Sequence, residues 1–238
     1  MKLKLLCVSL LASISFSVAQ STSPWTKVST FSSGVLESRL DLPQQNLFNL
    51  NVEAVKQSLN TVPNRFSSQK NGIVMEFPNE TGKMERFSVF ENSQMEAALA
   101  AQYPEIKSYI GIGIDNPTST IYFSISPLGF KSMQLNAGKS AVFIEPISSD
   151  LTTYTVYRKA DKVKHFSPFE CGVIDTVNEQ IDPSTLRPNA DDSTLRTFRL
   201  ALSCTGEYAT YFGGTTALAL AAMNNTMTRV NGVFEKDF

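Results

Sequence analysis

The sequence predicts an α+β fold: an antiparallel sheet that carries two helices, followed by the first strand and first helix of an incomplete α/β domain. Three observations predict it. Segments rich in β-branched and aromatic residues alternate with tight turns between residues 73 and 158. Two other stretches repeat apolar residues at helical spacing. A strand pattern and then a long helix pattern follow near the C-terminus.

Residues 1–19 are predicted to be a secretory signal peptide. Two lysines precede a short apolar run, and small residues lead up to Ala19, where cleavage would expose Gln20. The apolar run is shorter than the roughly 20 residues that a membrane span needs. We therefore expect a secreted, extracellular protein with no membrane span after signal removal. Cleavage would also remove Cys7, leaving Cys171 and Cys204.

The composition predicts a folded chain rather than a disordered one. Hydrophobic residues make up 42% and aromatic residues 10% of the chain, which is enough for a sizeable core. The net charge is −1, and no basic block stands out. Nucleic acid is therefore not an expected partner.

Two helices are expected in the N-terminal part. Asn51 can cap a helix over residues 51–59, in which the apolar residues fall on one face. A second helix is expected over residues 94–102, where Ser93 and Glu96 have the spacing of a capping box.

The strands are expected to form an antiparallel meander. Residues 73–77 and 85–90 flank a hairpin turn at 79–82, and five further strands follow in sequence. With the two helices they define one α+β domain over residues 20–160. The five further strands are expected at residues 107–114, 118–126, 130–135, 141–147 and 151–158.

A polar segment rich in proline and aspartate separates this domain from the last elements. We interpret residues 161–195 as a connector, and Arg187 and Arg196 are candidate sites of proteolytic processing in or beside it.

The last elements are a predicted strand over residues 197–203 and a predicted helix over 215–231, which Gly232 can end. An α/β unit this short cannot bury its own apolar face, so we expect the rest of the domain to lie beyond Phe238. The expected inner face of the helix combines small and apolar residues: Ala217, Leu220, Ala221, Met227 and Val230.

Two stretches resemble secreted bacterial reprolysin-like metallopeptidases, a branch of the metzincins (adamalysin type). Residues 77–130 contain an aromatic-rich hairpin, a helix ending in Tyr-Pro and a G-x-G-x-D segment, and they resemble the propeptide. Residues 196–238, RTFRLALSCTGEYATYFGGTTALALAAMNNTMTRVNGVFEKDF, are similar to the start of the protease domain.

The resemblance implies that residues 20–160 are a prodomain and residues 196–238 the beginning of a zinc metalloendopeptidase domain. The partners it implies are the missing protease domain and protein or peptide substrates. Zinc would be held by H-E-x-x-H-x-x-G-x-x-H, but the chain has one histidine and no such motif. No catalytic residue can therefore be assigned, and we expect the 238-residue chain to be inactive alone.

Cys171 is the candidate zinc ligand of this chain. The segment Glu170-Cys171-Gly172-Val173 resembles the cysteine switch of adamalysin-type propeptides, in which a thiolate takes the zinc position that catalysis needs for water. A disulfide between Cys171 and Cys204 is an equally open alternative, since an isolated cysteine pair in an exported protein often bridges.

Other motifs carry less weight. His165 is expected to be an ordinary histidine, and Gly111 and Gly113 lack the third glycine of a dinucleotide fingerprint. Glu207 matches the region where related domains bind structural calcium, but an exposed loop carboxylate is the simpler interpretation. The glycosylation patterns at residues 79–81 and 224–226 decide nothing.

A second function from a different class remains open. The chain could instead be a complete secreted binding module or a protein resembling a protease inhibitor, acting through its sheet edges or the Cys171 loop.

Overall fold

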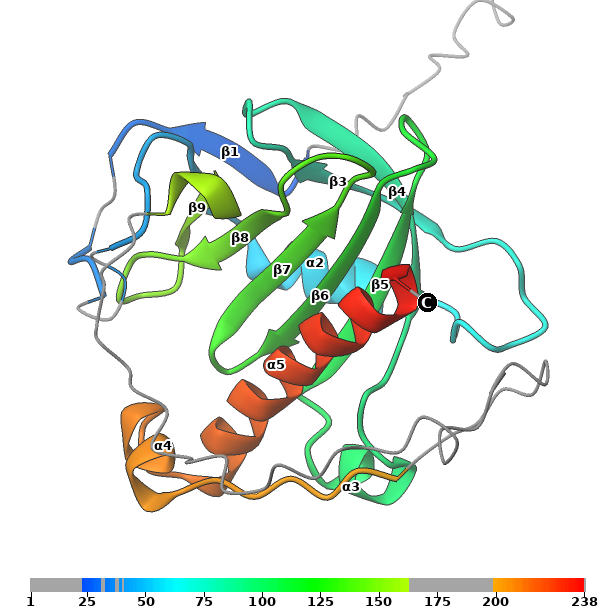
Figure 1. Cartoon of the computed structure of the whole chain (residues 1–238), viewed down its shortest axis with the longest axis vertical. Helices are drawn as coiled ribbons and strands as arrows, with labels where there is room; N and C mark the ends of the chain where they lie inside the picture. Colours follow the sequence, from blue (N-terminus) through cyan, green and yellow to red (C-terminus); the bar gives the residue numbers. More distant parts are fainter. Residues whose placement is uncertain (1–22, 31–32, 37–38, 40, 163–198, 238) are drawn as a thin grey trace, which may run out of the picture.

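The computed structural model describes residues 23–30, 33–36, 39, 41–162 and 199–237. Within them one curled antiparallel sheet of nine strands has helices on both of its faces (Figure 1). The strand order is β1-β2-β9-β8-β7-β6-β5-β4-β3. The strands are β1 (Trp25–Val28), β2 (Leu47–Leu50), β3 (Ile73–Pro78), β4 (Met84–Glu91), β5 (Lys107–Gly113), β6 (Thr120–Ser126), β7 (Gly129–Leu135), β8 (Val142–Pro146) and β9 (Thr153–Arg158).

The expected meander is confirmed. Strands β3 to β9 pair in sequence order, each antiparallel to the next, and the turn between β3 and β4 is the expected hairpin. Strands β1 and β2 were not expected, because each has only four residues within polar surroundings. Strand β2 pairs with β9 and so extends the sheet beyond the meander.

One face of the sheet packs an aromatic core against helix α2 (Val52–Leu59). Phe123 and Phe130 lie at its centre, with ring centroids 5.3 Å apart, and Phe77 stacks on Phe130 at 5.8 Å. Trp25 of β1 meets the edge of Phe130 at 5.4 Å. Successive side chains of a strand point to opposite faces of the sheet, so each strand contributes every second side chain to this core.

The prediction for α2 is confirmed in detail. Asn51 caps it, since its side chain accepts a hydrogen bond from the amide of Ala54 at 3.0 Å. The second helix is shorter than expected: α3 spans Ala97–Gln102. The capping box is wrong, because Glu96 itself is the cap residue, and the Ser93 hydroxyl donates to the carbonyl of Met95 at 3.2 Å.

The predicted strand at 197–203 is also wrong for the part that the structure describes. Residues 199–205 belong to no strand, and Leu200 and Leu202 are 63% and 50% exposed. A short helix, α4 (Gly206–Tyr211), follows instead. Alternation of apolar residues alone predicted a strand, but within the described residues no neighbouring strand pairs with this segment.

Helix α5 (Thr216–Asp237) is longer than the predicted helix. Gly232 does not end it. This glycine faces the ring of Tyr122 so closely that a Cβ atom would lie 2.7 Å from it, so the residue serves close packing inside the helix.

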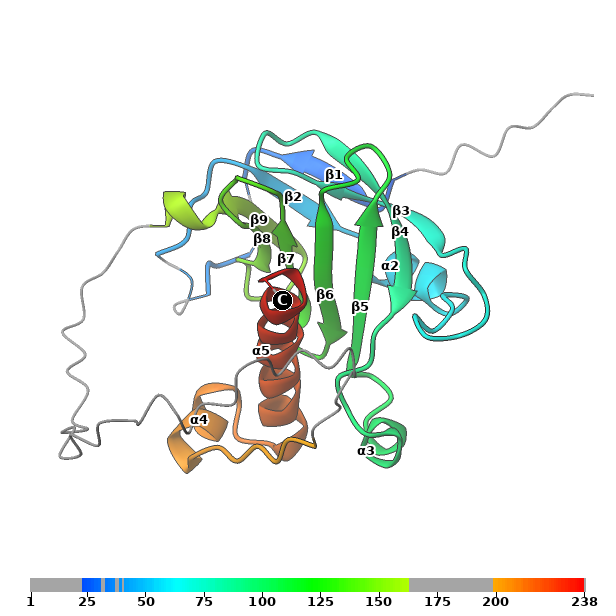
Figure 2. The ribbon, with the colours of Figure 1, turned by 45° about the vertical axis from the view of Figure 1, so that its right-hand side comes forward.

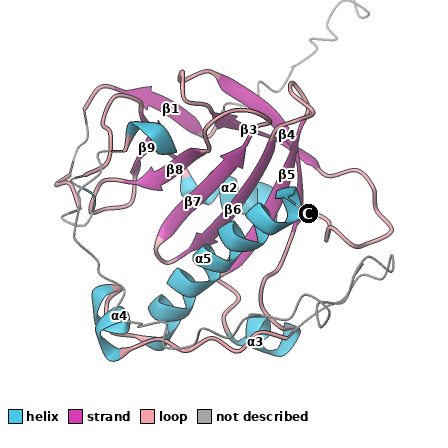
Figure 3. Cartoon of the chain, viewed as in Figure 1, coloured by secondary structure: helices cyan, strands magenta, loops and turns pink. Residues whose placement is uncertain are grey.

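Helix α5 lies across β5, β6 and β7 on the sheet face opposite to α2 (Figures 1 and 2). Figure 3 shows the same three layers coloured by secondary structure. The expectation that this helix has nothing to pack on within residues 1–238 is therefore wrong. It buries one face on the sheet of the preceding α+β region.

Candidate functional site

The contact between α5 and the sheet is the candidate functional site, and we call it the α5 interface. Its helix side is made of Ala221, Asn224, Asn225, Thr228 and Gly232, all buried. Residues 221, 225, 228 and 232 recur at the 4-3-4 spacing of one helix face. Small side chains on that face let the helix approach the strands closely.

Polar side chains of the strands meet this helix face. The Ser108 hydroxyl of β5 lies 2.9 Å from the Thr228 hydroxyl and accepts a hydrogen bond from the side-chain amide of Asn224 at 2.9 Å. The Ser124 hydroxyl of β6 donates to the side-chain oxygen Oδ1 of Asn225 at 3.1 Å. These groups satisfy one another's hydrogen bonds away from water, which burial requires.

The C-terminal end of α5 is tied by charge. Arg65 and Glu235 form an ion pair of 2.7 Å, and the Tyr122 hydroxyl donates to Glu235 at 3.3 Å. Burial and then the charge of Glu235 raise the pKa of Tyr122 to about 12. The phenol therefore stays protonated and able to donate at neutral pH.

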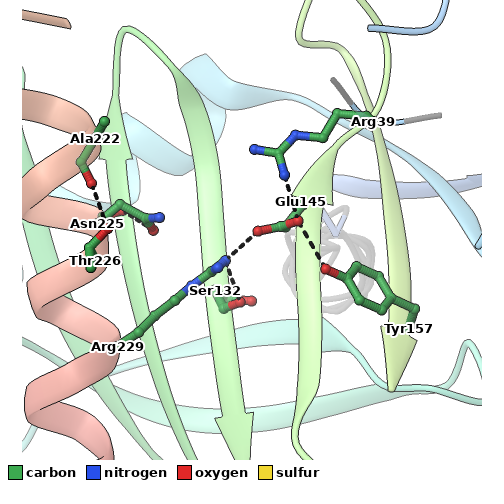
Figure 4. A network of polar contacts seen from close by, with 9 residues as sticks. Arg39, Ser132, Glu145, Tyr157, Ala222, Asn225, Thr226 and Arg229 are labelled. Atoms are coloured by element: carbon green, nitrogen blue, oxygen red, sulfur yellow. Dashed lines mark hydrogen bonds and ion pairs between the residues drawn. The ribbon is translucent and has the colours of Figure 1, made fainter. Parts of the chain in front are cut away.

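A buried charge network ties the middle of α5 to β8 (Figure 4). The carboxylate of Glu145, which is 4% exposed, accepts from Arg229 of α5 at 2.8 Å and from Arg39 at 3.1 Å. The Tyr157 hydroxyl of β9 donates to it at 2.9 Å. The guanidinium of Arg229 also lies over the ring of Phe143, 5.0 Å from its centroid.

Burial raises the pKa of Glu145, but the charges of Arg229 and Arg39 outweigh burial and lower it to about 2. Glu145 is therefore ionised at every pH at which the protein is expected to work. Burial, and then the charge of the same carboxylate, raises the pKa of Tyr157. Loss of a charged partner from a buried carboxylate is destabilising unless another cation replaces it.

A groove of about 870 Å³ lies on the other side of α5. We call it the apolar groove. Residues 199–202 and the loop before α3 form its other walls. Its apolar lining includes Met95, Leu200, Leu202, Met227 and Val230. The sequence places Met227 and Val230 on the inner face, so the helix is rotated relative to the sequence prediction.

The candidate zinc ligand Cys171 lies outside the described residues, as do His165, Arg187 and Arg196. Among the described residues Cys204 has an exposed, free thiol. The cysteine switch and the disulfide alternative both remain predictions.

Zinc also remains a prediction. Within the described ranges, no three or more histidine, cysteine, aspartate or glutamate side chains come together in a way that could hold a metal ion. Glu207 is exposed in the first turn of α4, where its negative charge interacts favourably with the helix dipole. Its pKa is lowered by a hydrogen bond from its own backbone amide and then by the Thr205 side chain.

The remaining motifs have structural roles. Gly111 lies where a Cβ atom would come within 2.7 Å of Ile121, and Gly113 where it would meet the carbonyl of Asn116, so close packing explains both glycines. Asn79 and Asn224 are buried and hydrogen-bonded. Neither offers an accessible amide for glycosylation in this fold.

No family model, curated protein or solved structure matches the chain. Among the described helices none is both long enough and apolar enough to cross a membrane.

Sequence reasoning missed the α5 interface. Its signal was present: Asn224, Asn225 and Thr228 lie on one side of the helix with Ala221. Polar residues on a helix are ordinarily assigned to solvent, so the sequence favours the apolar stripe containing Met227 as the inner face. Serines in β5 and β6 were the complementary signal.

Proposed function

We propose that this chain is the N-terminal part of a secreted zinc-dependent metalloendopeptidase zymogen. The region of residues 20–160 acts as the prodomain, which assists folding and keeps the protease latent. Residues 196–238 are the beginning of the protease domain. Chemistry would require the zinc motif of the longer protein, so the 238 residues alone have no peptidase activity.

One observation carries the proposal: the two stretches that resemble this family lie against each other. Residues 77–130 supply β5, β6 and the start of β7, and α5 of the second stretch packs across these strands. A prodomain must hold its protease domain and later release it. Contact between these stretches, which are far apart in the chain, is what that role requires.

The composition of the α5 interface also supports the proposal. Separable interfaces are more polar than permanent cores, because their groups must be hydrated after separation. Ser108, Ser124, Asn225 and Thr228 fit that requirement. The apolar groove on the opposite side of α5 is the surface that the rest of a protease domain would cover.

The first test reads the coding sequence beyond Phe238. We expect H-E-x-x-H within about 150 further residues, the scale of one domain. The longer product should hydrolyse peptides with zinc and lose activity with a chelator, whereas the 238-residue chain should be inactive with zinc. A coding sequence that ends without the motif, or activity of the 238-residue chain, contradicts the proposal.

The second test cuts the connector. A specific protease site is introduced between residues 163 and 198, and the purified chain is cleaved under native conditions. We expect the C-terminal fragment to co-elute with the sheet fragment in size-exclusion chromatography and to separate in denaturant. Immediate separation after cleavage would contradict a docking role of the sheet. The uncleaved chain carrying the same site is the matched control.

A secreted binding module or inhibitor-like protein is the second candidate. The observation that favours it is the packing of α5 on the sheet, since the C-terminal helix then does not need a further domain to bury its inner face. In that case the 238-residue chain should inhibit a zinc endopeptidase of the metzincin type and spare a serine protease. No inhibition of either enzyme, together with a downstream zinc motif, decides for the zymogen.

A further inference from the structure

Among the described residues, Lys131 is a buried cation that has no hydrogen-bonding partner. It lies on β7, on the sheet face that α5 covers, and is 6% exposed. Within the described residues its ammonium group has no hydrogen bond or ion pair. It contacts the ring of Phe212, whose centroid is 5.8 Å away. Such a distant aromatic contact compensates only weakly for the lost hydration of an ammonium ion.

Like charges surround Lys131. Arg39 and Arg229 both raise the electrostatic cost of its charge, and among the described residues Glu145 is the neighbouring anion that acts on it. The carboxylate of Glu145 is already occupied by the two arginines and the Tyr157 hydroxyl. The cluster therefore holds three cations and one anion beneath α5.

The sheet register places Lys131 beside this carboxylate. Ser132 of β7 pairs with Ile144 of β8. Because the two strands are antiparallel, the residue before Ser132, which is Lys131, lies opposite the residue after Ile144, which is Glu145. Residues in such positions have Cβ atoms about 5 Å apart, within easy reach of a lysine side chain. No Lys131–Glu145 ion pair forms while Arg229 of α5 binds the carboxylate.

We propose that Lys131 is a release element for α5: a buried cation that opposes docking of the helix and pairs with Glu145 when Arg229 leaves. Docking exchanges a Lys131–Glu145 pair for an Arg229–Glu145 pair and leaves the lysine buried and unpaired. The sheet thus carries its own substitute for the helix arginine. The proposal depends on the docking role given to α5 above, but on no peptidase activity.

The exchange has a defined pH dependence. Burial and then the charges of Arg39 and Arg229 lower the pKa of Lys131 to about 8 in the docked state. In the undocked state water and Glu145 return it to its ordinary range near 10.4 or above. The free-energy penalty that the charge of Lys131 puts on docking is present in full below pH 8. It disappears as the pH rises from the docked pKa to the undocked pKa of Lys131. Alkaline pH therefore tightens α5 on the sheet.

Amide hydrogen exchange of α5 tests this exchange in the intact chain. We expect α5 protection factors, corrected for intrinsic rates, to rise about tenfold between pH 7 and pH 9 in the unmodified chain. Lys131→Met should raise protection at pH 7 by up to about 100-fold and remove the pH dependence. Lys131→Arg should keep the low protection and also lose the pH dependence, since arginine does not titrate there.

Lys131→Arg separates charge from improved packing, because the methionine variant could stabilise the chain for either reason. Strand β6 amides report whether each variant keeps its fold. Protection of α5 that does not change with pH in the unmodified chain, or a Lys131→Arg variant that follows Lys131→Met, overturns the proposal. Neither outcome bears on a zinc motif beyond Phe238. A failure of the Lys131 proposal can therefore be told apart from a failure of the zymogen proposal.

The titration of Lys131 itself is the second measurement. Its side-chain ¹³Cε shift should titrate near pH 8 in the unmodified chain. In Arg229→Gln, where the carboxylate of Glu145 is free of its helix partner, the midpoint should move to about 10 or above. An ordinary lysine midpoint in the unmodified chain, or no shift between the two proteins, contradicts the exchange.

Discussion

The two faces of the sheet are built from different chemistry. On the α2 side, Phe77, Phe123 and Phe130 pack ring against ring in a core that also takes in Trp25 and Tyr154. On the α5 side, asparagines and a threonine of the helix meet serines of the strands and a charge network, beside a smaller apolar cluster of Ile110, Tyr122 and Met133. Both faces are buried, yet one is an apolar core and the other a hydrogen-bonded interface.

This difference indicates which contact can open. Exposing the aromatic core would bring large apolar surfaces into water, which is costly. Separating α5 exposes a smaller apolar cluster together with polar groups that can exchange their partners for water, at a net cost of about 1 kcal/mol per hydrogen bond. We therefore expect the α2 side to separate only on global unfolding and the α5 side to open locally.

The largest effect is expected in the aromatic core. Phe130→Ala should lower the free energy of unfolding by about 3–5 kcal/mol, because it leaves a cavity among packed rings. Urea unfolding measures the loss, which exchange of β6 amides should show in full, while exchange of α5 amides through their local opening should change less. Phe130→Leu, which keeps most of the volume, is the matched control and should cost less. A loss below about 1 kcal/mol for the alanine variant would contradict the assignment of this core.

The charge network comes next. Glu145→Gln should destabilise the α5 contact by about 3 kcal/mol, because two partly buried arginines lose their buried counter-charge. Tyr157→Phe removes only a neutral donor from the same carboxylate and should cost about 1 kcal/mol. Exchange of α5 amides measures both variants. Equal effects of the two substitutions would show that the carboxylate charge is not what holds the helix.

Acid should destabilise the folded protein through the same carboxylate. Since the pKa of Glu145 is lowered in the folded protein, its stabilisation is present above the ordinary glutamate value near 4.3 and is lost as the pH falls toward 2. The free energy of global unfolding should therefore decrease between pH 5 and pH 2. Glu145→Gln should show a smaller decrease over that range, and an identical pH profile for both proteins would rule out Glu145 as the titrating group.

A single hydrogen bond should have the smallest effect. Asn225→Ala leaves the Ser124 hydroxyl unsatisfied under α5 and should cost about 1–2 kcal/mol. Adding Ser124→Ala should recover part of that loss, because both partners are then absent. The change should be visible in α5 exchange and much smaller in β6. If the free-energy loss of the double variant equals the sum of the two single losses, the two side chains do not form a direct hydrogen bond.

The sequence was a good guide to the sheet and a poor one to the α5 interface. The meander from β3 to β9 follows from alternation and turn residues, which act locally. The short strands β1 and β2 depend on pairing with β9, which is distant in sequence. Met227 and Val230 gave a plausible apolar face, but the sheet presents serines and a charged cluster, so the polar face of the helix is the buried one. Only the three-dimensional partner decides between two such faces.

Hydrogen exchange in increasing, sub-denaturing urea tests the central claim most directly. We predict that α5 amides exchange through a local opening with a lower free energy and a weaker urea dependence than β6 amides, which exchange on global unfolding. Equal free energies and equal urea dependence for α5 and β6 would contradict the claim that α5 is held by a releasable interface.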